Sequence, residues 1–287
     1  LYRGLKCISI RGKKIDDIVA AFVKAMNEVF TKICIQWEDF PGVDAIKILN
    51  TYKEKVCTFN DDIQGTAAIA TAGFISISRL MKKRFIDQHF LFLGAGAAAF
   101  GIADMLVKKF QRDGLTKEEA LSQIWMFDVN GLLVKSRKDL VEHQFQFAHD
   151  SDPCTDFAEA VLRIKPTAIV GVSTVGGAFN QQVIENMSTV NERPIIFPYS
   201  NPTSHSECTA EQAYNWSKGK AIFASGSPFA PVEYQGKIFT PGQGNNVFIF
   251  PALGMAIFAT EAKRVTDDML IVAAEAVAEQ VSTADFD

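Results

Sequence analysis

Short apolar runs that alternate with helical segments are the feature of this sequence that most restricts its fold. Five such runs occur between residues 89 and 225, namely HFLFLG, IWMFDV, TAIVGV, PIIFPYS and AIFAS. Continuously apolar strands separated by helices are typical of a parallel sheet that is covered on both faces. The sequence therefore predicts an α/β fold with a doubly wound, mainly parallel sheet.

The N-terminal region repeats this rhythm on a smaller scale. Two short apolar runs, ICIQW and VCTF, are separated by an amphipathic stretch at 45–55, and apolar residues at helical spacing predict a helix over about 16–31. Small apolar residues over 62–83 predict a helix that is buried on most sides. At about 100 to 200 residues per domain, the 287 residues suggest two domains, or one large domain with an insertion.

Composition excludes several classes of protein. The chain has 29 Lys and Arg against 33 Asp and Glu, a formal net charge of −4, so no net basic field attracts nucleic acid or an anionic membrane surface. Its most apolar stretch, 247–259, is 13 residues long, whereas a membrane span needs about 20. The five cysteines are scattered and form no CxxC pair, which argues against a disulfide framework or a zinc site. We expect an intracellular protein with reduced thiols that acts on small molecules.

A glycine-rich loop stands between the run HFLFL and an apolar helix. The segment 94–99, GAGAAA, fits the pattern G-x-G-x-x-G/A, in which Gly94 permits a tight turn and Gly96 lets the backbone approach a pyrophosphate. The next predicted strand ends in Asp128, where a ribose-binding acid is expected, although the gap exceeds the usual ~20 residues because a polar helix around 115–122 intervenes. The alternative is a tight strand–helix junction followed by a turn aspartate.

Acidic pairs follow two of the N-terminal runs. Glu38 and Asp39 close one predicted strand, and Asp61 and Asp62 follow the next. If the two strands are neighbours, the four carboxylates meet at one edge, where their repulsion requires a cation or protons. Oxygen ligands of this kind select Mg²⁺ or Mn²⁺. The alternative is a helix N-cap together with a solvated turn.

Asparagines mark two further turns. Asn201 follows the run PIIFPYS, and Asn245 and Asn246 lie in PGQGNN, ahead of an apolar helix that we expect to be buried. Asparagine offers both a donor and an acceptor, which suits ribose hydroxyls or a substrate carboxylate. Asn-Pro and Pro-Gly also form ordinary turns, and on the residues alone the structural interpretation is favoured.

These motifs together resemble those of malic enzymes. The resemblance runs in order over nearly the whole chain, and its segments are QWEDF, TFNDDIQGTA, LFLGAGAAAFGIA, IWMFDVNGLLVKSRKDL, SNPTSHSECTAEQAY, FASGSPF and PGQGNNVFIFPALG. The resemblance implies oxidative decarboxylation of (S)-malate to pyruvate and CO₂, with NAD or NADP as cofactor and Mn²⁺ or Mg²⁺ as metal. It also implies a Rossmann-type NAD(P)-binding domain inserted into a second α/β catalytic domain.

The resemblance assigns roles residue by residue. Glu38, Asp39 and Asp62 resemble the metal ligands, and Asp61 resembles the catalytic aspartate beside them. The residues that would bind the dinucleotide are Gly94, Gly96, Ala97, Ala98, Asp128, Asn201 and Asn245. Malate would be contacted by Asn201 and Asn246.

The sequence also departs from the family pattern. Malic enzymes use a lysine base and a tyrosine acid from motifs that precede EDF, and no YTPT-like segment or matching lysine motif precedes Glu38. We therefore expect a fragment that keeps the metal ligands, lacks the proton-transfer pair and is inactive by itself. Ala97 stands where many members have glutamate in the loop.

The choice between NAD and NADP rests on few residues. Asp128 suits the ribose of NAD, whereas Lys135 and Arg137 could reach a 2′-phosphate or could be surface charges. The segment 139–150 has no lysine, which slightly favours NAD.

Family architecture places residues 1–60 in the catalytic domain, 61–245 in the NAD(P)-binding domain and 246–287 in an incomplete return to the catalytic domain. A homo-oligomer, dimer or tetramer, is expected of the full-length protein, in the cytoplasm or a mitochondrial-type organelle. Two other functions stay open: a metal-independent Rossmann dehydrogenase, which leaves the acidic pairs unexplained, and a non-catalytic dinucleotide-binding module.

Overall fold

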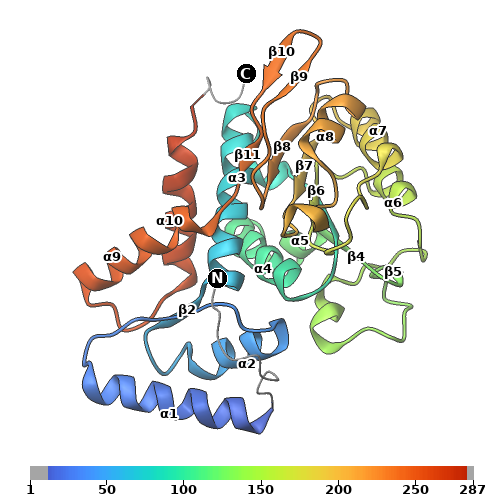
Figure 1. Ribbon diagram of the computed structural model, residues 1–287. Coiled ribbons are helices and arrows are strands. Elements are labelled where there is room, and N and C mark those ends of the chain that lie inside the picture. Colours follow the sequence, from blue (N-terminus) through green and yellow to red (C-terminus); the bar gives the residue numbers. More distant parts are fainter. Residues whose placement is uncertain (1–11, 283–287) are drawn as a thin grey trace.

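A seven-stranded sheet forms the centre of the computed structural model, which describes residues 12–282 (Figure 1). Its strand order is β11–β8–β7–β6–β3–β4–β5, and every neighbouring pair is parallel except β4 with β5. The strands are β3 (Phe90–Leu93), β4 (Ile124–Asp128), β5 (Gly131–Leu132), β6 (Ala168–Gly171), β7 (Ile195–Pro198), β8 (Ile222–Ser225) and β11 (Gly242–Gln243). The predicted mainly parallel sheet is confirmed.

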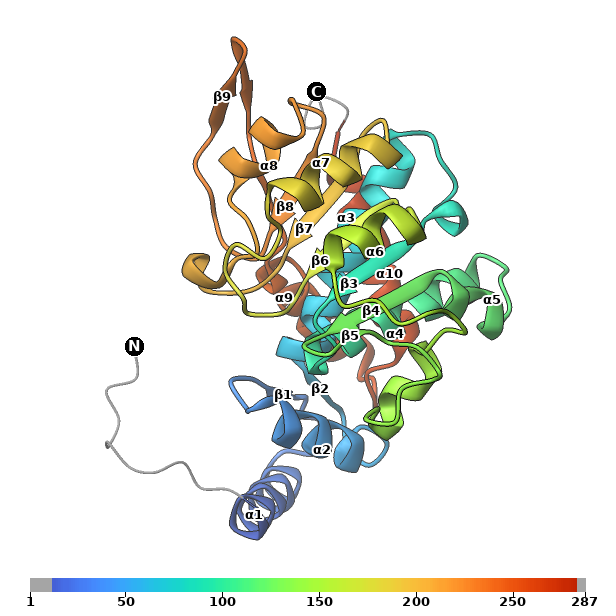
Figure 2. The same ribbon diagram turned by 90° about the vertical axis from the view of Figure 1, so that its right-hand side faces the viewer.

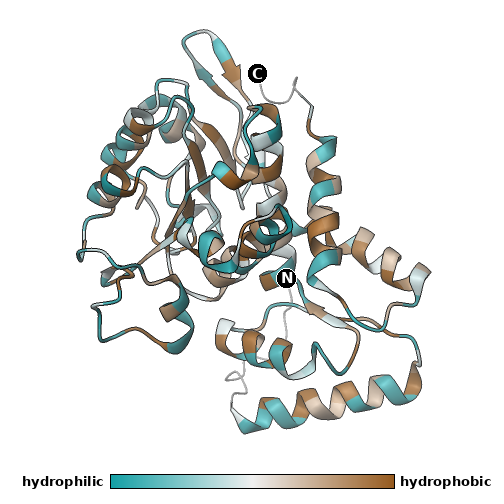
Figure 3. Cartoon of the chain, turned by 180° about the vertical axis from the view of Figure 1, so that it is seen from behind, coloured by the Kyte–Doolittle hydropathy of each residue, from teal (hydrophilic) through white to brown (hydrophobic). Residues whose placement is uncertain are grey.

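Helices cover both faces of this sheet, and the side chains on both faces of its strands are hydrophobic (Figure 3). On one face, Phe90 and Phe92 pack with α3 (Thr66–Leu80), α4 (Ala97–Arg112) and α10 (Asp267–Gln280). On the other face, Leu91 belongs to a core with residues of α6 (Phe157–Ile164), α7 (Gln181–Val190) and α8 (Ala210–Trp216). The alternation of neighbouring residues between two cores is the doubly wound arrangement that the apolar runs predict. The polar helix expected near 115–122 is α5 (Lys117–Ser122).

The N-terminal elements form a small separate layer at one end of the molecule (Figure 2). They are α1 (Lys13–Val29), β1 (Ile35–Trp37), α2 (Gly42–Tyr52) and β2 (Thr58–Asn60). The two strands pair in parallel, with Trp37 opposite Asn60. Val19, Val23 and Ile48 pack against β1 in a core of their own, so one face of α1 is buried and its other face is polar or exposed.

Short or exposed elements were not predicted from the sequence. They are β5, β11 and the hairpin of β9 (Val232–Tyr234) and β10 (Lys237–Phe239). Helix α10, which is 14 residues long and partly buried, was not predicted either. The expectation that the helix after PGQGNN is buried was wrong. Within α9 (Phe250–Thr260) only Leu253 and Ile257 are buried, whereas Phe258 is 86% exposed. A helix that is apolar on all sides still buries only the side that neighbours cover, and the described residues cover one side of α9.

The two ends of the described chain contact each other through ion pairs. The Lys32 ammonium lies 2.5 Å from the Glu261 carboxylate, and Arg264 pairs with Glu54. Helix α10, by contrast, packs along α3 beside the main sheet (Figure 1). The domain boundaries at 60 and 246 and the homo-oligomer remain predictions. Across residues 12–282, no helix combines the length and the apolar character that crossing a bilayer requires.

The packing of α3 on the sheet generates a stability prediction. The Phe74 ring, 1% exposed, lies 4.7 Å from the centroids of both Phe90 and Phe197. We expect Phe74→Ala to lower the free energy of unfolding by about 3–5 kcal/mol, because it removes a buried aromatic ring and leaves a cavity. Urea denaturation followed by circular dichroism measures this change. Phe145→Ala, at a 56% exposed ring, is the matched control and should stay within about 0.5 kcal/mol of the parent; equal effects would contradict the packing described.

Candidate metal and dinucleotide site

The parallel pairing of β1 with β2 brings the two acidic pairs together. Since Trp37 lies opposite Asn60, the residues that follow each strand emerge at the same edge. The backbone N–H of Asp39 donates to Asp62 Oδ2 at 2.8 Å, and Gln36 Nε2 donates to Glu38 Oε2 at 3.1 Å. The expectation that the two strands are neighbours is thereby confirmed.

A single π-helical turn, Asp61–Gly65, carries the second acidic pair into α3. Asn60 fixes its start: its Oδ1 accepts from Ile63 N at 2.9 Å, and its backbone N–H donates to Gln64 Oε1 at 3.0 Å. Gly65 permits the turn to close, because a Cβ there would lie 2.0 Å from Asp61 Oδ1. Such π turns are often found at functional sites, and neither Asn60 nor Gly65 was singled out from the sequence.

Asp61 is the most constrained of the acids. Its side chain is fully buried, and its Oδ2 accepts a 2.6 Å hydrogen bond from Asn246 Nδ2. Its Oδ1 has no partner among the described residues. Burial, and then the negative charges of Glu38 and Asp62, raise the pKa of Asp61 to about 7. A carboxyl in this position favours a proton or a nearby cation.

Asp62 is subject to opposing effects. Burial raises its pKa, and the negative charge of Asp39 adds to the rise, whereas the hydrogen bond from the Asp39 backbone N–H acts in the opposite direction. Asp39 itself has a left-handed backbone conformation, with φ of 61°, which aims its N–H at Asp62. The turn after β1 is thus shaped around the second acidic pair.

The donor set suits a hard cation, although its arrangement is not that of a bound site. The carboxylates of Glu38, Asp39 and Asp62 offer the oxygen ligands that Mg²⁺ and Mn²⁺ prefer. Asp61 Oδ1 has no hydrogen-bond partner among the described residues, and the pKa values of Asp61 and Asp62 are raised, as expected of buried carboxylates with like charges nearby. Within residues 12–282, no three His, Cys, Asp or Glu side chains are grouped closely enough to hold a metal ion as they stand. The assignment of Glu38, Asp39 and Asp62 as ligands therefore stays a prediction.

The glycine-rich loop lies where the sequence predicts, between β3 and α4. Gly94 has φ of 114°, and a Cβ there would lie 2.5 Å from the Val172 carbonyl oxygen, so only glycine fits. Gly96 is the N-cap of α4, has no side-chain cap and faces open space where a Cβ would project. Ala99 is fully buried, which allows the helix to approach the strand. The loop thus has the geometry of an anion-binding helix N-terminus, with Ala97 and Ala98 in its first turn.

Asp128 ends β4 as predicted, and its carboxylate forms an ion pair with Arg137. Arg137 binds it in a bidentate ion pair, with Nη–O distances of 2.8 and 2.9 Å, and also binds Asp139 through Nε and Nη2. The remaining Nη1 donor reaches the Gly131 carbonyl at 3.0 Å. These contacts raise the pKa of Arg137 and lower that of Asp139. The Arg137 side chain is therefore largely buried with its donors in use, whereas Lys135 is exposed.

The three predicted asparagines differ in what they contact. Asn246 reaches Asp61, which places the PGQGNN turn at the acidic edge. Asn245 caps the short helix Asn246–Phe248 through a 2.9 Å bond from Val247 N. Asn201 follows β7, precedes a cis peptide bond to Pro202 and accepts from Ser227 Oγ at 2.6 Å.

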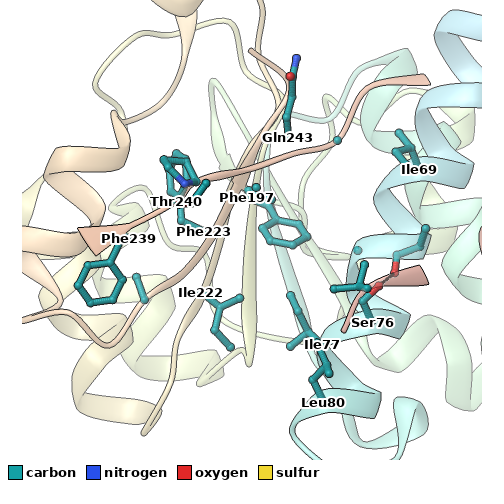
Figure 4. Close-up of a pocket in the computed structure, with 18 of the residues that line it drawn as sticks. Ile69, Ser76, Ile77, Leu80, Phe197, Ile222, Phe223, Phe239, Thr240 and Gln243 are labelled. Atoms are coloured by element: carbon teal, nitrogen blue, oxygen red, sulfur yellow. Dashed lines mark hydrogen bonds between the residues drawn. The ribbon is translucent and has the colours of Figure 1, made fainter. Parts of the chain in front are cut away.

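One cavity lies among residues that the sequence did not single out. A cavity of about 690 Å³ is bounded by Ile69 and Ile77 of α3, Phe223 of β8, and Phe239 and Gln243 (Figure 4). None of the residues predicted for metal, dinucleotide or malate binding lines it. The cavity is therefore separate from the candidate site.

Two family profiles match this chain. The sequence profile "Malic enzyme, NAD binding domain" matches residues 63–287, and "Malic enzyme, N-terminal domain" matches residues 1–53. The NADP-dependent malic enzyme of Homo sapiens is 46% identical over 284 residues, which cover 98% of this chain and 50% of that protein. The mitochondrial NADP-dependent malic enzyme of Mus musculus is 44% identical, with 98% and 47% covered. The chain thus spans about half the length of these relatives.

Solved structures give the same family. The malic enzyme of Entamoeba histolytica superposes with a TM-score of 0.74 at 25% identity, covering 94% of this chain and 52% of that one. The malic enzyme of Pyrococcus horikoshii superposes with a TM-score of 0.72 at 26% identity, covering 94% and 58%. The chain belongs to the malic enzyme family.

Proposed function

We propose that the protein to which this chain belongs oxidises (S)-malate with NAD(P)⁺ and decarboxylates the product to pyruvate and CO₂, with Mn²⁺ or Mg²⁺. Family membership supports this proposal, and one contact carries it: the Asn246–Asp61 hydrogen bond joins the PGQGNN turn to the acidic edge. A metal-independent dehydrogenase would leave the buried, charge-perturbed Asp61 without a role.

Glu38, Asp39 and Asp62 would hold the cation, and Asp61 would stand beside it. When bound, the cation supplies Lewis-acid stabilisation of negative charge on the oxygens of the substrate. Asp61 is kept in place by Asn246 and by the close approach of Gly65, so its carboxyl has one fixed orientation. Burial of Asp61 keeps water from its carboxyl and raises its pKa to about 7.

The dinucleotide would bind along the carboxyl edge of the main sheet. The N-terminus of α4, with Gly94, Gly96, Ala97 and Ala98, would bind the pyrophosphate through backbone N–H groups. Asn201 and Asn245 would contact the nicotinamide end, and Asn201 and Asn246 would contact malate.

Charges around Asp128 favour NAD over NADP. All five N–H donors of Arg137 point to Asp128, Asp139 or a carbonyl, which leaves none for a 2′-phosphate. Asp128, Arg137 and Asp139 together carry one net negative charge, which repels a phosphate. The two relatives described above are named NADP-dependent, so a preference for NAD would distinguish this chain from them.

Binding without turnover is the result expected of these 287 residues, because no lysine–tyrosine motif of the family lies among them. Isothermal titration with NAD⁺ and NADP⁺, each with and without Mn²⁺ and malate, measures binding, and pyruvate formation in the same sample measures turnover. The proposed function would be contradicted if neither NAD⁺ nor NADP⁺ bound. Turnover at rates typical of enzymes would show that groups within this chain supply the missing acid and base.

Removing a metal ligand should weaken cation binding selectively. We expect Asp62→Asn to raise the dissociation constant for Mn²⁺, measured by electron paramagnetic resonance, at least about tenfold, because a neutral amide replaces a charged oxygen ligand. Asp152→Asn, at an exposed carboxylate outside the N-terminal layer, is the matched control and should leave the constant unchanged. An equal effect of both variants would mean that the acidic edge is not the site.

Neutralising Asp128 should relax the nucleotide preference. In Asp128→Asn the pair with Arg137 loses its charge, so Arg137 regains donors and the local charge rises by one. We expect the ratio of the NADP⁺ to the NAD⁺ dissociation constant to fall by roughly tenfold. Titration of both nucleotides measures the ratio, and a ratio that does not change would remove Asp128 from the ribose site.

A further inference from the structure

Glu207 is a buried carboxyl to which the proposed function gives no role. Its side chain is fully buried, on the segment that leads from β7 to α8. It lies inside the motif SNPTSHSECTAEQAY but was not among the residues predicted for the site. Acidic side chains are almost never fully buried unless they are paired, so its contacts reveal what it holds.

One oxygen of Glu207 joins the ends of two neighbouring strands. Oε1 accepts hydrogen bonds from the Ser173 backbone N–H and from Ser173 Oγ, both at 2.8 Å, and from Ser200 Oγ at 2.6 Å. Ser173 follows β6 and Ser200 follows β7, which is parallel to it. Ser200 Oγ also accepts from the Thr174 N–H at 2.9 Å. A single carboxyl thus orients both loops at the carboxyl edge of the sheet.

The other oxygen of Glu207, Oε2, is buried without a hydrogen bond from any described residue, which lowers the stability of the fold. Oε2 has no hydrogen-bond partner among the described residues and lies against Gly171, the last residue of β6, where a Cβ would come within 2.4 Å of it. Burying a carboxyl oxygen without a hydrogen-bond partner costs stability. The cost favours a role in the geometry of the loops.

The loops in question include a residue of the proposed site. Ser200 immediately precedes Asn201, which the proposed function places at the nicotinamide end of the dinucleotide and at malate. Thr174, held by Ser200, has a left-handed backbone conformation with φ of 60°, so the loop after β6 is also fixed in a specific shape. We infer that Glu207 is a positioning residue that sets Asn201 for the nicotinamide ring, an inference that rests on the proposed function.

Comparison of two nucleotides separates positioning from general stability. NADH carries the nicotinamide ring and ADP-ribose lacks it, so both can occupy the pyrophosphate loop but only NADH needs Asn201. In Glu207→Gln the charge-assisted bonds to Ser173 and Ser200 become neutral ones. We expect the dissociation constant for NADH, measured by fluorescence titration, to rise about tenfold while that for ADP-ribose, measured by calorimetry, stays within about twofold.

Matched variants complete the test. Ser200→Ala, which removes one of the three bonds, and Asn201→Ala should show the same selective loss of NADH affinity. Glu185→Gln, at an exposed glutamate on α7, should change neither constant. The positioning role is wrong if Glu207→Gln and Ser200→Ala lower the affinities for NADH and ADP-ribose equally, or lower neither. It is also wrong if the parent chain binds NADH with the same affinity as ADP-ribose. If the parent binds neither nucleotide, the proposed function itself fails.

Discussion

Parallel strand pairing is the constraint on which the rest of this structure depends. Parallel neighbours run in the same direction, so their carboxyl ends meet at one edge, and every loop that leaves them emerges there. In the N-terminal layer this brings Glu38 and Asp39 beside Asp61 and Asp62. In the main sheet it brings the loops after β3, β6 and β7 together. Residues from distant parts of the chain are thereby brought close together.

Two fully buried carboxyls contact residues that follow these strands, and they share a pattern. Asp61 accepts one hydrogen bond through Oδ2, and Glu207 accepts three through Oε1. The other oxygen of each has no partner among the described residues. Each also lies against a glycine, Gly65 or Gly171, where a side chain would collide with it. The apolar cores on both faces of the sheet supply the stability against which such groups can be kept.

Sequence reasoning succeeded where burial leaves a pattern. Strands β3, β4, β6, β7 and β8 lie between two layers of helices, so their sequences are apolar runs. The spacing of Gly94, Gly96 and Ala99 is typical of the turn between a strand and a helix in dinucleotide-binding folds. β5 and β11 are two residues long, and β9 and β10 are largely exposed, so they carry no such pattern.

The partners of side chains were less predictable than the strands. Composition shows that α9 is apolar but not which neighbours cover it. The clamp of Arg137 on Asp128 and the hold of Glu207 on two loops depend on turns whose shape the sequence does not reveal. The metal ligands, the asparagine roles and the domain boundaries rest on resemblance and stay predictions.

The Asp61–Asn246 contact joins residues 185 positions apart, and this separation has a consequence for how the protein folds. Closing a loop of that length in an unfolded chain costs entropy, so we expect the contact to form after the sheet between its partners has assembled. The contact is therefore expected to be among the first lost when either end of the chain opens locally. An opening of α9 or of the N-terminal layer that breaks this contact would separate the PGQGNN turn from the acidic edge while the central sheet stays paired, so the candidate site is expected to be less stable than the fold that carries it.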